Sequence, residues 1–250
     1  MNQDDPYETT RVLREYLLFH YGSEREILSL GIGPRDALGF CLRTVDLLLD
    51  ADSLCQRDRA LDLGCAVGGS SFALAKTFGE VIGIDKSHAL IEAAKVLRKE
   101  GELTYESRRQ GAFMDTLQAR VDPGVDRSRI RFQVADACEL DSSLGPFDVV
   151  HAANLLCRLP DPRALLSQLP DLVRPGGQLL LATPFTWLDE FTPSCNWLGK
   201  GEEDSFQDLK LMISNDFELQ FEIDIPFLIR EHERKFQYGI SLGTRWRRKR

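Results

Sequence analysis

The residues best suited to chemistry lie in one glycine-rich segment, Ala60–Ser71, which combines an apolar run with Gly64, Gly68 and Gly69. A strand that ends in such a turn and continues into a helix presents free backbone N–H groups, and its glycines let a ligand approach the backbone closely. Many α/β domains carry a glycine turn here for packing alone. The turn by itself therefore leaves both interpretations open.

An acidic residue follows at the spacing that nucleotide-binding folds use. Asp85 ends the next apolar run about 20 residues further on, where a carboxylate can accept hydrogen bonds from both hydroxyls of a ribose. The alternative is that Asp85 only caps the helix that follows, although Ser87 can serve as that cap. Together, the turn and the carboxylate favour a nucleotide-type ligand.

The turn also distinguishes between two classes of nucleotide. It lacks the second glycine of the G-x-G-x-x-G pattern, which admits the pyrophosphate of a dinucleotide. It carries Asp62 shortly before Gly64, and a carboxylate there repels a pyrophosphate but suits a cationic ligand. A cationic ligand with a ribose indicates S-adenosylmethionine.

The apolar periodicity predicts the elements that position these residues. Helices are expected up to Gly22, after Pro34 (with an apolar stripe from Leu38 to Leu49), over Ser87–Lys99 and over Phe206–Ile213. Strands are expected at Ala60–Leu63, Val81–Ile84, Ile130–Val134, Phe147–Ala152 and Gln178–Ala182, and an antiparallel pair within 218–246 closes the sheet edge. Apolar strands that alternate with helices are typical of a parallel sheet covered on both faces.

Two segments interrupt this alternation. Glu102–Ser128 is a long charged connection, and Phe185–Asp204 is rich in aromatic residues. Long connections in a compact domain usually carry function or are mobile. We therefore expect a single domain, 1–250, with an N-terminal helical cap (1–55), a cofactor-binding core (56–183) and a substrate-side segment (184–250).

Composition argues against several classes of function. The chain has 31 Lys and Arg against 39 Asp and Glu, and its net charge of −8 gives no general attraction to nucleic acid or anionic membranes. The basic segment Arg245–Arg250 is expected to be a solvated tail. No apolar stretch approaches the roughly 20 residues of a membrane span, and Met1–Pro6 lacks secretory-signal character, so we expect a cytoplasmic protein. The six cysteines lack metal-ligand spacing, so no metal is expected.

The spaced motifs resemble the class I S-adenosylmethionine-dependent methyltransferases over about residues 59–183. The matching segments are Asp62–Gly68, Asp85, Val134–Ala137, Phe147–Asn154 and Val173–Gly177, with Ala66 in place of the usual middle glycine. The resemblance implies a Rossmann-like α/β fold with a mostly parallel seven-stranded sheet, one antiparallel edge strand, helices on both faces and an N-terminal helical extension. It implies cofactor contacts at Asp62, Gly64, Cys65, Ala66, Gly68, Asp85, Lys86, Asp136, Ala137 and Asn154.

The flanks resemble, more narrowly, the methyltransferase domain of ovothiol-biosynthesis enzymes. The segments that carry this likeness are Tyr7–Glu8, Glu15–Gly22, Ala153–Pro160, Thr183–Pro193 and Pro226–Phe236. In that family the domain is often fused behind a sulfoxide-synthase module, so a separate sulfoxide synthase is the expected pathway partner here. The resemblance implies methylation of an imidazole nitrogen of 4-mercaptohistidine, which yields ovothiol A and S-adenosylhomocysteine.

Three residues are candidates for catalysis in such a transfer. Asn154 follows the fourth strand, where methyltransferases place substrate-facing groups; the alternative is a turn-forming asparagine. Glu190 and His232 are candidate acceptors for the imidazole proton, although a histidine in a charged run is more often a surface residue. The other histidines, His20, His88 and His151, are expected to be structural.

An amino-acid substrate also needs a cation for its carboxylate and a surface for its ring. Arg230 is the first choice for the carboxylate because a guanidinium binds it bidentately, and Arg158 or Arg43 is the next. Stacking and lid roles are expected for Phe185, Trp187, Tyr7 and Tyr16, with plain packing as the alternative for Trp187 and Tyr16.

Other functions remain open from the sequence. A nucleobase methyltransferase would carry an Asn-Pro-Pro-type turn, which is missing after the fourth strand, and a cytosine C5 enzyme would carry a Pro-Cys dipeptide, which does not occur. The remaining alternatives are a methyltransferase of another histidine- or thiol-containing metabolite, a catalytically silent partner subunit and, more distantly, an NAD-dependent dehydrogenase.

Overall fold

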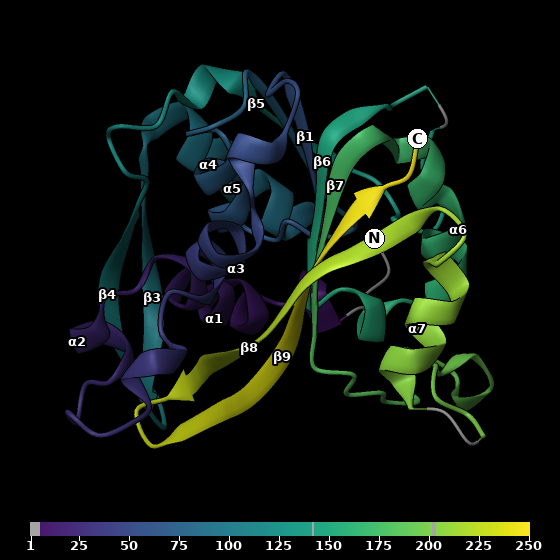
Figure 1. The fold of residues 1–250 in the computed structure, drawn as a ribbon. Helices are drawn as coiled ribbons and strands as arrows, with labels where there is room; N and C mark the ends of the chain where they lie inside the picture. Colours follow the sequence, from purple (N-terminus) through teal and green to yellow (C-terminus); the bar gives the residue numbers. More distant parts are fainter. Residues whose placement is uncertain (1–5, 142, 202–203) are drawn as a thin grey trace.

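The computed structural model describes residues 6–141, 143–201 and 204–250, and its centre is a seven-stranded sheet in the order β5-β2-β1-β6-β7-β9-β8 (Figure 1). The strands of this sheet are β1 (Arg59–Leu63), β2 (Glu80–Asp85), β5 (Ile130–Val134), β6 (Phe147–Ala153), β7 (Val173–Thr183), β8 (Phe217–His232) and β9 (Lys235–Arg248). The first five are parallel, and β9 is antiparallel to both β7 and β8. The sequence predicted this sheet, including the antiparallel closure.

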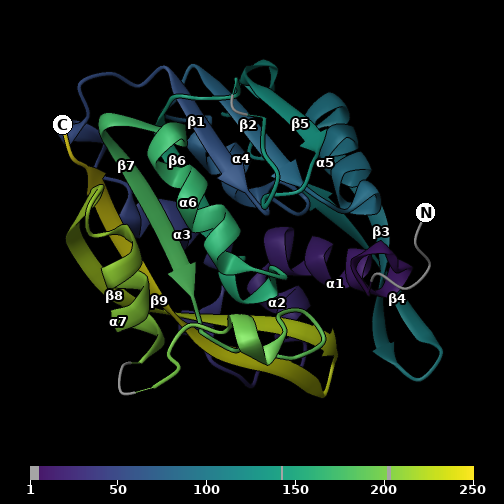
Figure 2. The same ribbon diagram turned by 90° about the vertical axis from the view of Figure 1, so that its right-hand side faces the viewer.

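Helices cover both faces of the sheet (Figures 1 and 2). One side carries α3 (Phe40–Leu48), α4 (Gly69–Leu74) and α5 (His88–Glu100), and the other carries α6 (Pro162–Leu172) and α7 (Ser205–Ile213). Each layer has its own apolar core. Strand β6 is buried along nearly its whole length, which explains its continuous apolar sequence.

The N-terminal helices α1 (Thr10–Tyr21) and α2 (Glu24–Ile27) lie near the ends of the parallel strands (Figure 1). Thr9 caps α1 through its side chain, and the helix ends before Gly22 as predicted. Ser23 and Glu26 form a capping box that starts α2 immediately afterwards. Within the described residues no helix is both long and apolar enough to cross a membrane.

The predicted second helix begins later than its proline suggests. Arg35–Ala37 forms only a 3₁₀ turn, and α3 starts after Gly39, whose φ of +67° breaks the continuity. Phe40 and Leu48 are buried, whereas Leu42, which we placed on the apolar stripe, is 44% exposed. The buried face of α3 therefore consists of Phe40, Cys41, Thr44, Val45 and Leu48 and is rotated relative to the predicted stripe.

The charged connection between α5 and β5 is a hairpin, which the sequence did not predict. It consists of β3 (Glu102–Gln110) and β4 (Phe113–Arg120), joined at Gly111, which has a φ of +54°. The strands are mostly exposed and polar, and Tyr105 and Ser107 are buried where β3 packs on the rest of the molecule. Since the burial alternates along a charged strand, no continuous apolar signal marks it.

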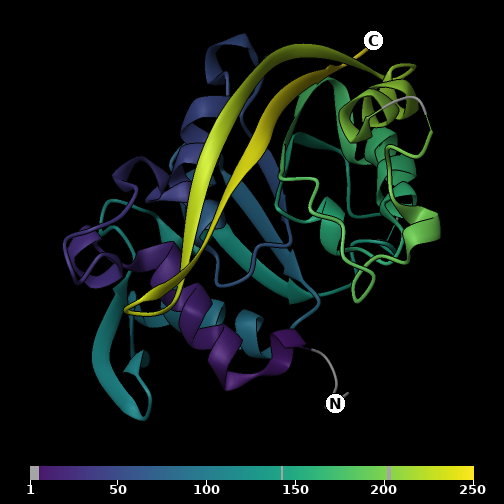
Figure 3. The same cartoon turned by 90° about the horizontal axis from the view of Figure 1, so that it is seen from below.

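A second, longer hairpin links the sheet edge to the N-terminal helices. Strands β8 and β9 leave the sheet beside β7 and extend until they pass α1 (Figure 3). The tip reaches the first hairpin, where the Glu233 N–H donates to the carbonyl of Arg109 at 3.0 Å. The two hairpins and α1 thus meet on one side of the molecule.

Candidate active site

The residues predicted to contact the cofactor gather where neighbouring parallel strands end. Strand β1 pairs with β2 and β6, so Gly64, Asp85 and Asn154 all lie at the same edge of the sheet. The Asn154 N–H donates to the carbonyl of Ala182 at 2.7 Å, which adds the end of β7 to this group. In open α/β sheets, ligands bind outside the carboxyl ends of the strands.

The glycine turn has a backbone that larger residues cannot adopt easily. Gly64 and Gly68 have φ values of +67° and +88°, and Ala66 between them has a φ of +47°. A Cβ atom on Gly68 would lie 2.6 Å from the ring of Phe132. Glycine at this position is therefore required both by conformation and by space.

Asp85 holds the glycine turn and the following helix together. Its carboxylate accepts hydrogen bonds from the N–H groups of Ala66 at 3.0 Å and Ser87 at 2.9 Å, one on each oxygen. Ser87 caps α5 with its own hydroxyl, so Asp85 is not needed as the side-chain cap of that helix. Each oxygen keeps an acceptor position, which suits a pair of ribose hydroxyls. Burial raises the pKa of Asp85, and the two backbone hydrogen bonds oppose that rise.

Asp62 lies beneath the turn in a buried polar network. It is 1% exposed, and its carboxylate accepts from the Ser71 hydroxyl at 2.6 Å and lies 2.8 Å from Nδ1 of His151. His151 Nε2 is 3.1 Å from the hydroxyl of Thr44. Because Asp62 is buried and each of its oxygens already contacts a protein group, a positioning role is favoured over direct contact with a ligand.

His20 supports the same turn from α1. The Gly69 N–H donates to Nδ1 of His20 at 3.0 Å, at the start of α4. Burial lowers the pKa of His20 to about 4, so the ring is neutral at pH 7 and its Nδ1 is available as an acceptor. We had expected His20 to be structural, and the structure identifies what it supports.

The turn after β5 is hydrogen-bonded to the backbone of Asp85. The Ala135 N–H donates to the carbonyl of Asp85 at 3.1 Å, and the Asp136 carboxylate accepts from the N–H of Cys138 at 2.8 Å. Asp136 is exposed and Ala137 is buried. This places the predicted adenine-side residues next to the predicted ribose carboxylate.

The segment before α1 covers the end of β2. The Ser87 hydroxyl donates to the carbonyl of Tyr7 at 3.1 Å, and Glu8 accepts from the N–H of His88 at 2.7 Å. The Lys86 ammonium lies 5.7 Å from the centre of the Tyr7 ring. Tyr7 is therefore anchored directly beside the turn that carries Asp85.

Three aromatic rings and one arginine lie together beside this turn. We call Tyr7, Tyr16, Phe191 and Arg158 the cover. Tyr7 packs against Tyr16 at 6.1 Å and against Phe191 at 5.9 Å, measured between ring centres. The Arg158 guanidinium lies 4.8 Å from the centre of the Phe191 ring, and it also donates to the Thr186 carbonyl at 3.0 Å. Burial raises the pKa of Tyr7 and Tyr16, and the charge of Arg158 opposes that rise in both. Phe191 was absent from the predicted site, although it lies in the aromatic segment.

Asn154 has a fixed orientation. Its φ is +54°, and its side-chain oxygen accepts a hydrogen bond from the hydroxyl of Ser241 in β9 at 2.6 Å. Ser241 is fully buried, and no local sequence pattern marks it as a site residue. Among the described residues, the amide nitrogen of Asn154 donates no hydrogen bond, so its N–H groups are available to a ligand.

The remaining aromatic candidates lie on the α7 side. The Phe185 and Trp187 rings are 6.5 Å apart, and the Trp187 indole N–H donates to the Ser205 hydroxyl at 3.0 Å. This bond holds Trp187 towards the start of α7. Glu190 is exposed in a turn of the same segment. The structure thus gives Trp187 a packing role and leaves Glu190 outside the ring cluster.

Arg230 and His232 do not join this group. They pair with Phe236 and Lys235 in the β8–β9 hairpin, and Lys235 is six residues from Ser241 along β9, about 20 Å at 3.3 Å per residue. Arg230 is 3% exposed and donates to the carbonyl of Arg108 at 3.4 Å and to that of Glu26. The register of the hairpin therefore separates both residues from Asn154, and the roles we predicted for them do not fit this geometry.

The described cysteines do not join Asp, Glu or His residues in a metal-binding cluster. The six are free thiols, and the part of the chain that the structure describes contains no group of three or more His, Cys, Asp or Glu residues placed to hold a metal ion. Cys65 lies inside the glycine turn, and burial raises its thiol pKa well above the ordinary value. A thiol in that state is a poor nucleophile, so we assign Cys65 no chemical step.

Comparison with known proteins agrees with this geometry. The family model described as a methyltransferase domain matches residues 35–220. The ubiquinone biosynthesis O-methyltransferase of Coxiella burnetii (strain Dugway 5J108-111) is 29% identical over 123 residues, 49% of this chain and 42% of that protein. The match thus covers less than half the length of that relative.

Two solved structures share the fold over nearly the whole chain. The N-methyltransferase NodS from Bradyrhizobium japonicum WM9, in complex with S-adenosyl-L-homocysteine, has a TM-score of 0.54 and 15% identity, covering 94% of this chain and 98% of that one. Magnesium protoporphyrin IX methyltransferase from Synechocystis PCC 6803 has a TM-score of 0.54 and 20% identity, covering 99% and 100%. The chain belongs to the methyltransferase-domain family, within the class I S-adenosylmethionine-dependent methyltransferases.

Proposed function

We propose that this chain binds S-adenosylmethionine at the ends of β1, β2 and β5 and methylates a nitrogen of a small molecule. The observation that carries the proposal is Asp85, whose two oxygens are held by backbone N–H groups beside the glycine turn. This arrangement presents two fixed acceptors to a ribose. When bound, the cofactor supplies an electrophilic methyl group on a cationic sulfur.

The residues around Asn154 are suited to align an acceptor with that methyl group. Ser241 fixes the side-chain oxygen of Asn154, so the amide N–H groups have one direction. In a displacement at a methyl carbon the nitrogen–carbon bond forms as the sulfur–carbon bond breaks, and orientation of the two partners supplies about 7–11 kcal/mol of the barrier reduction in favourable cases. Asn154 therefore acts by orientation and need not transfer a proton.

For the acceptor we propose an imidazole nitrogen of 4-mercaptohistidine, with ovothiol A as the product. The likeness of the flanking segments to ovothiol-biosynthesis methyltransferases supplies this identity, and the cover supports it. The rings of Tyr7 and Phe191 offer a surface for a planar imidazole, and the Arg158 guanidinium beside them can pair with a carboxylate. Arg158 thus replaces Arg230 as our choice for the carboxylate partner.

The proton on the acceptor must leave during the reaction. A neutral imidazole attacks through its unprotonated nitrogen, and the proton on the other nitrogen is then lost to solvent or to a nearby acceptor. Tyr7 and Tyr16 are unsuitable as bases because burial keeps their phenols protonated. The thiolate of the substrate is the competing nucleophile, so selectivity depends on the orientation that the cover imposes.

Calorimetry tests the proposed cofactor, and mass spectrometry separately tests the proposed substrate. Titration with S-adenosylhomocysteine and, in parallel, with NAD should show binding of the former alone; binding of NAD alone would reject the cofactor assignment. Incubation of enzyme and S-adenosylmethionine with 4-mercaptohistidine, histidine and ergothioneine should give a ring-methylated product from the first.

Two outcomes of the second experiment would change the substrate assignment. A methyl group on sulfur, or equal turnover of histidine, would contradict methylation of the mercaptohistidine ring. Because the relative quoted above is an O-methyltransferase, an acceptor with a phenolic hydroxyl and no imidazole should be included as a further arm. Turnover of that acceptor alone would support the family activity and reject the ovothiol substrate.

A further inference from the structure

A second, separate pocket lies where α1 meets the two hairpins. It has a volume of about 190 Å³, which is the volume of about six water molecules at roughly 30 Å³ each. Its lining comes from α1, β3, β4 and β8 and consists of Arg11, Arg14, Glu15, Ser107, Arg108, Met114, Arg230 and Glu231. Four arginines and two glutamates leave this small space with an excess of positive charge.

Arg230 is the buried cation of this pocket, and its hydrogen bonds are incomplete. Its side chain donates to the carbonyls of Glu26 and Arg108, but Nε has no partner. Asp115 and Glu233 act on Arg230 only through their electrostatic fields, and among the described residues no carboxylate lies within ion-pair distance of its guanidinium. A buried guanidinium with an unused donor is costly unless an acceptor joins it.

The other charged residues leave room for an added anion. Arg14 is paired with Glu106, and Glu231 is paired with Lys235 at 2.7 Å. Arg11 approaches Glu15 only to 3.9 Å, and the charge of Arg108 acts on Glu15 without a direct ion pair among the described residues. Among the described residues, Arg108 and Arg230 thus have no direct ion-pair partner inside the pocket.

We propose that this pocket binds a small oxyanion, the phosphate or carboxylate group of a metabolite, through Arg108 and Arg230. The available volume suits phosphate or a short dicarboxylate and excludes a nucleotide. Because Arg108 lies in β3 and Arg230 lies in β8, an anion bound to both would join the two hairpins beside α1. The lining residues are distinct from those around Asp85 and Asn154, so an anion here does not occupy the proposed methyl-transfer site.

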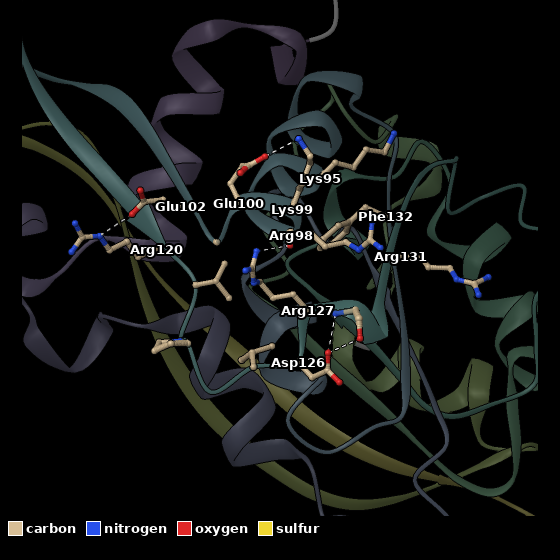
Figure 4. A pocket seen from close by; sticks show the side chains of 15 residues that line it. Lys95, Arg98, Lys99, Glu100, Glu102, Arg120, Asp126, Arg127, Arg131 and Phe132 are labelled. Atoms are coloured by element: carbon tan, nitrogen blue, oxygen red, sulfur yellow. Dashed lines mark hydrogen bonds and ion pairs between the residues drawn. The ribbon is translucent and has the colours of Figure 1, made fainter.

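A larger basic cleft on the molecule serves as the comparison. It has a volume of about 1060 Å³ and lies at the end of α5, where Lys95, Arg98, Lys99, Arg120, Arg127 and Arg131 are among the side chains (Figure 4). Lys99 is paired with Glu100 at 2.8 Å, and Arg127 donates to the Arg98 carbonyl at 2.7 Å (Figure 4). The C-terminus of α5 adds partial negative charge, so this cleft is less suited to an anion than the pocket at Arg230.

Thermal unfolding with inorganic phosphate and with malonate tests the proposal, with sodium chloride at equal ionic strength as the reference. At ten times the dissociation constant, the anion should raise the midpoint of the wild-type protein by about 3–6 °C. The exposed Arg108 allows the substitution Arg108→Gln, which should abolish the shift, whereas Arg120→Gln in the other cleft should retain it.

The response to the two anions identifies the source of the oxyanion. A shift with phosphate alone assigns a phosphate group, and a shift with malonate alone assigns a carboxylate. An equal shift in Arg108→Gln, or one reproduced by sodium chloride, would overturn the proposal. Titration of Arg108→Gln with S-adenosylhomocysteine should give the wild-type affinity, so failure of this site is distinguishable from failure of the methyltransferase assignment.

Discussion

The proposed cofactor side and the proposed substrate side of this molecule are built in different ways. On the cofactor side, backbone groups of one continuous turn and one carboxylate meet within 25 residues of chain, between Asp62 and Asp85. On the proposed substrate side, the residues come from distant segments: Tyr7, Arg158 and Phe191 belong to the cover, and Ser241 orients Asn154. The glycine turn with Asp85 therefore tolerates almost no change in backbone conformation. The substrate-side residues can be substituted one at a time without a change in the backbone.

The largest effect should come from the backbone of the cofactor side. Gly68→Ala adds a Cβ at 2.6 Å from the Phe132 ring at a φ of +88°, so left-handed strain of about 1–2 kcal/mol and overpacking of about 1–3 kcal/mol combine. We expect a loss of about 2–5 kcal/mol in the free energy of unfolding, measured by urea denaturation, together with loss of cofactor binding.

Gly111→Ala is the matched control. Gly111 also has a positive φ, +54°, but a Cβ there would meet no atom within 4 Å. This variant should lose only the strain component, about 1–2 kcal/mol. If both variants lose the same amount, close packing against Phe132 is not what requires glycine at position 68.

The next effect should appear as a dependence of stability on pH. The pKa of His20 is lowered from 6.5 to about 4, so the folded protein favours the neutral ring. The stability that this provides is present above pH 6.5 and is lost as the pH falls towards 4, by up to about 3 kcal/mol. Urea denaturation at pH 7 and at pH 4.5 should show this loss in the wild-type protein and a smaller one in His20→Gln.

The exposed His88 provides the control for that measurement. His88→Gln should keep the wild-type pH dependence, because His88 contributes its backbone N–H and not its ring to the contact with Glu8. Comparing the loss of unfolding free energy in His20→Gln with that in His88→Gln cancels the contribution of the other titratable groups. A wild-type profile in His20→Gln would show that the ring is not buried against Gly69 in solution.

Loss of the ribose carboxylate should have a smaller but selective effect. Asp85→Ala should weaken S-adenosylhomocysteine binding by about 1.5–3 kcal/mol, roughly 10- to 150-fold in the dissociation constant, as measured by calorimetry. Asp85→Asn should lose less, because one acceptor oxygen remains. Unchanged affinity in folded Asp85→Ala protein would remove the assignment.

Asp85 also makes cofactor affinity and stability respond to pH in opposite directions. Because burial raises the pKa of Asp85, protonation in the folded protein begins at a higher pH than for an ordinary aspartate. As the pH falls through this raised pKa, the folded state gains stability from the neutral carboxyl, while the acceptor for the ribose hydroxyls is lost. Calorimetry with S-adenosylhomocysteine at decreasing pH should show that binding to the wild-type protein becomes weaker. The affinity of Asp85→Asn should not change with pH.

The smallest effect should come from the cover, where one side chain changes at a time. Arg158→Gln should raise the Michaelis constant for the amino-acid substrate about tenfold and leave cofactor affinity unchanged, since the lost contact is a single charge-assisted hydrogen bond. Arg230→Gln should instead lower the unfolding midpoint with little change in the Michaelis constant, because Arg230 links β8 to α2 and β3. The opposite result would restore Arg230 as the carboxylate partner.

The sequence predicted the parts that depend on local spacing. The five parallel strands, the glycine turn and the ends of α1 and α5 were all placed to within a few residues. The antiparallel closure by β8 and β9 was also predicted. In each case the signal is a run of apolar residues bounded by a glycine or a cap, and tertiary contacts only reinforce it.

Features that depend on the pairing of distant strands could not be predicted from local sequence patterns. The β3–β4 hairpin was missed because its strands are charged and only alternate residues such as Tyr105 are buried. His232 and Arg230 were misplaced because the pairing of β8 with β9 carries them away from Asn154. Ser241 reaches Asn154 only through that same pairing, so its role is visible only in the folded structure.

The position of β9 also has a consequence for biosynthesis. Strand β9 lies between β7 and β8 but is translated after both of them, so the edge of β7 stays unpaired until β9 emerges from the ribosome. An open, apolar sheet edge of this kind is prone to pair with other chains. Since Ser241 lies in β9, the orientation of Asn154 is set only in this final step. A nascent chain would thus acquire its cofactor turn early and its methyl-transfer geometry late, and pausing before β9 would favour aggregation.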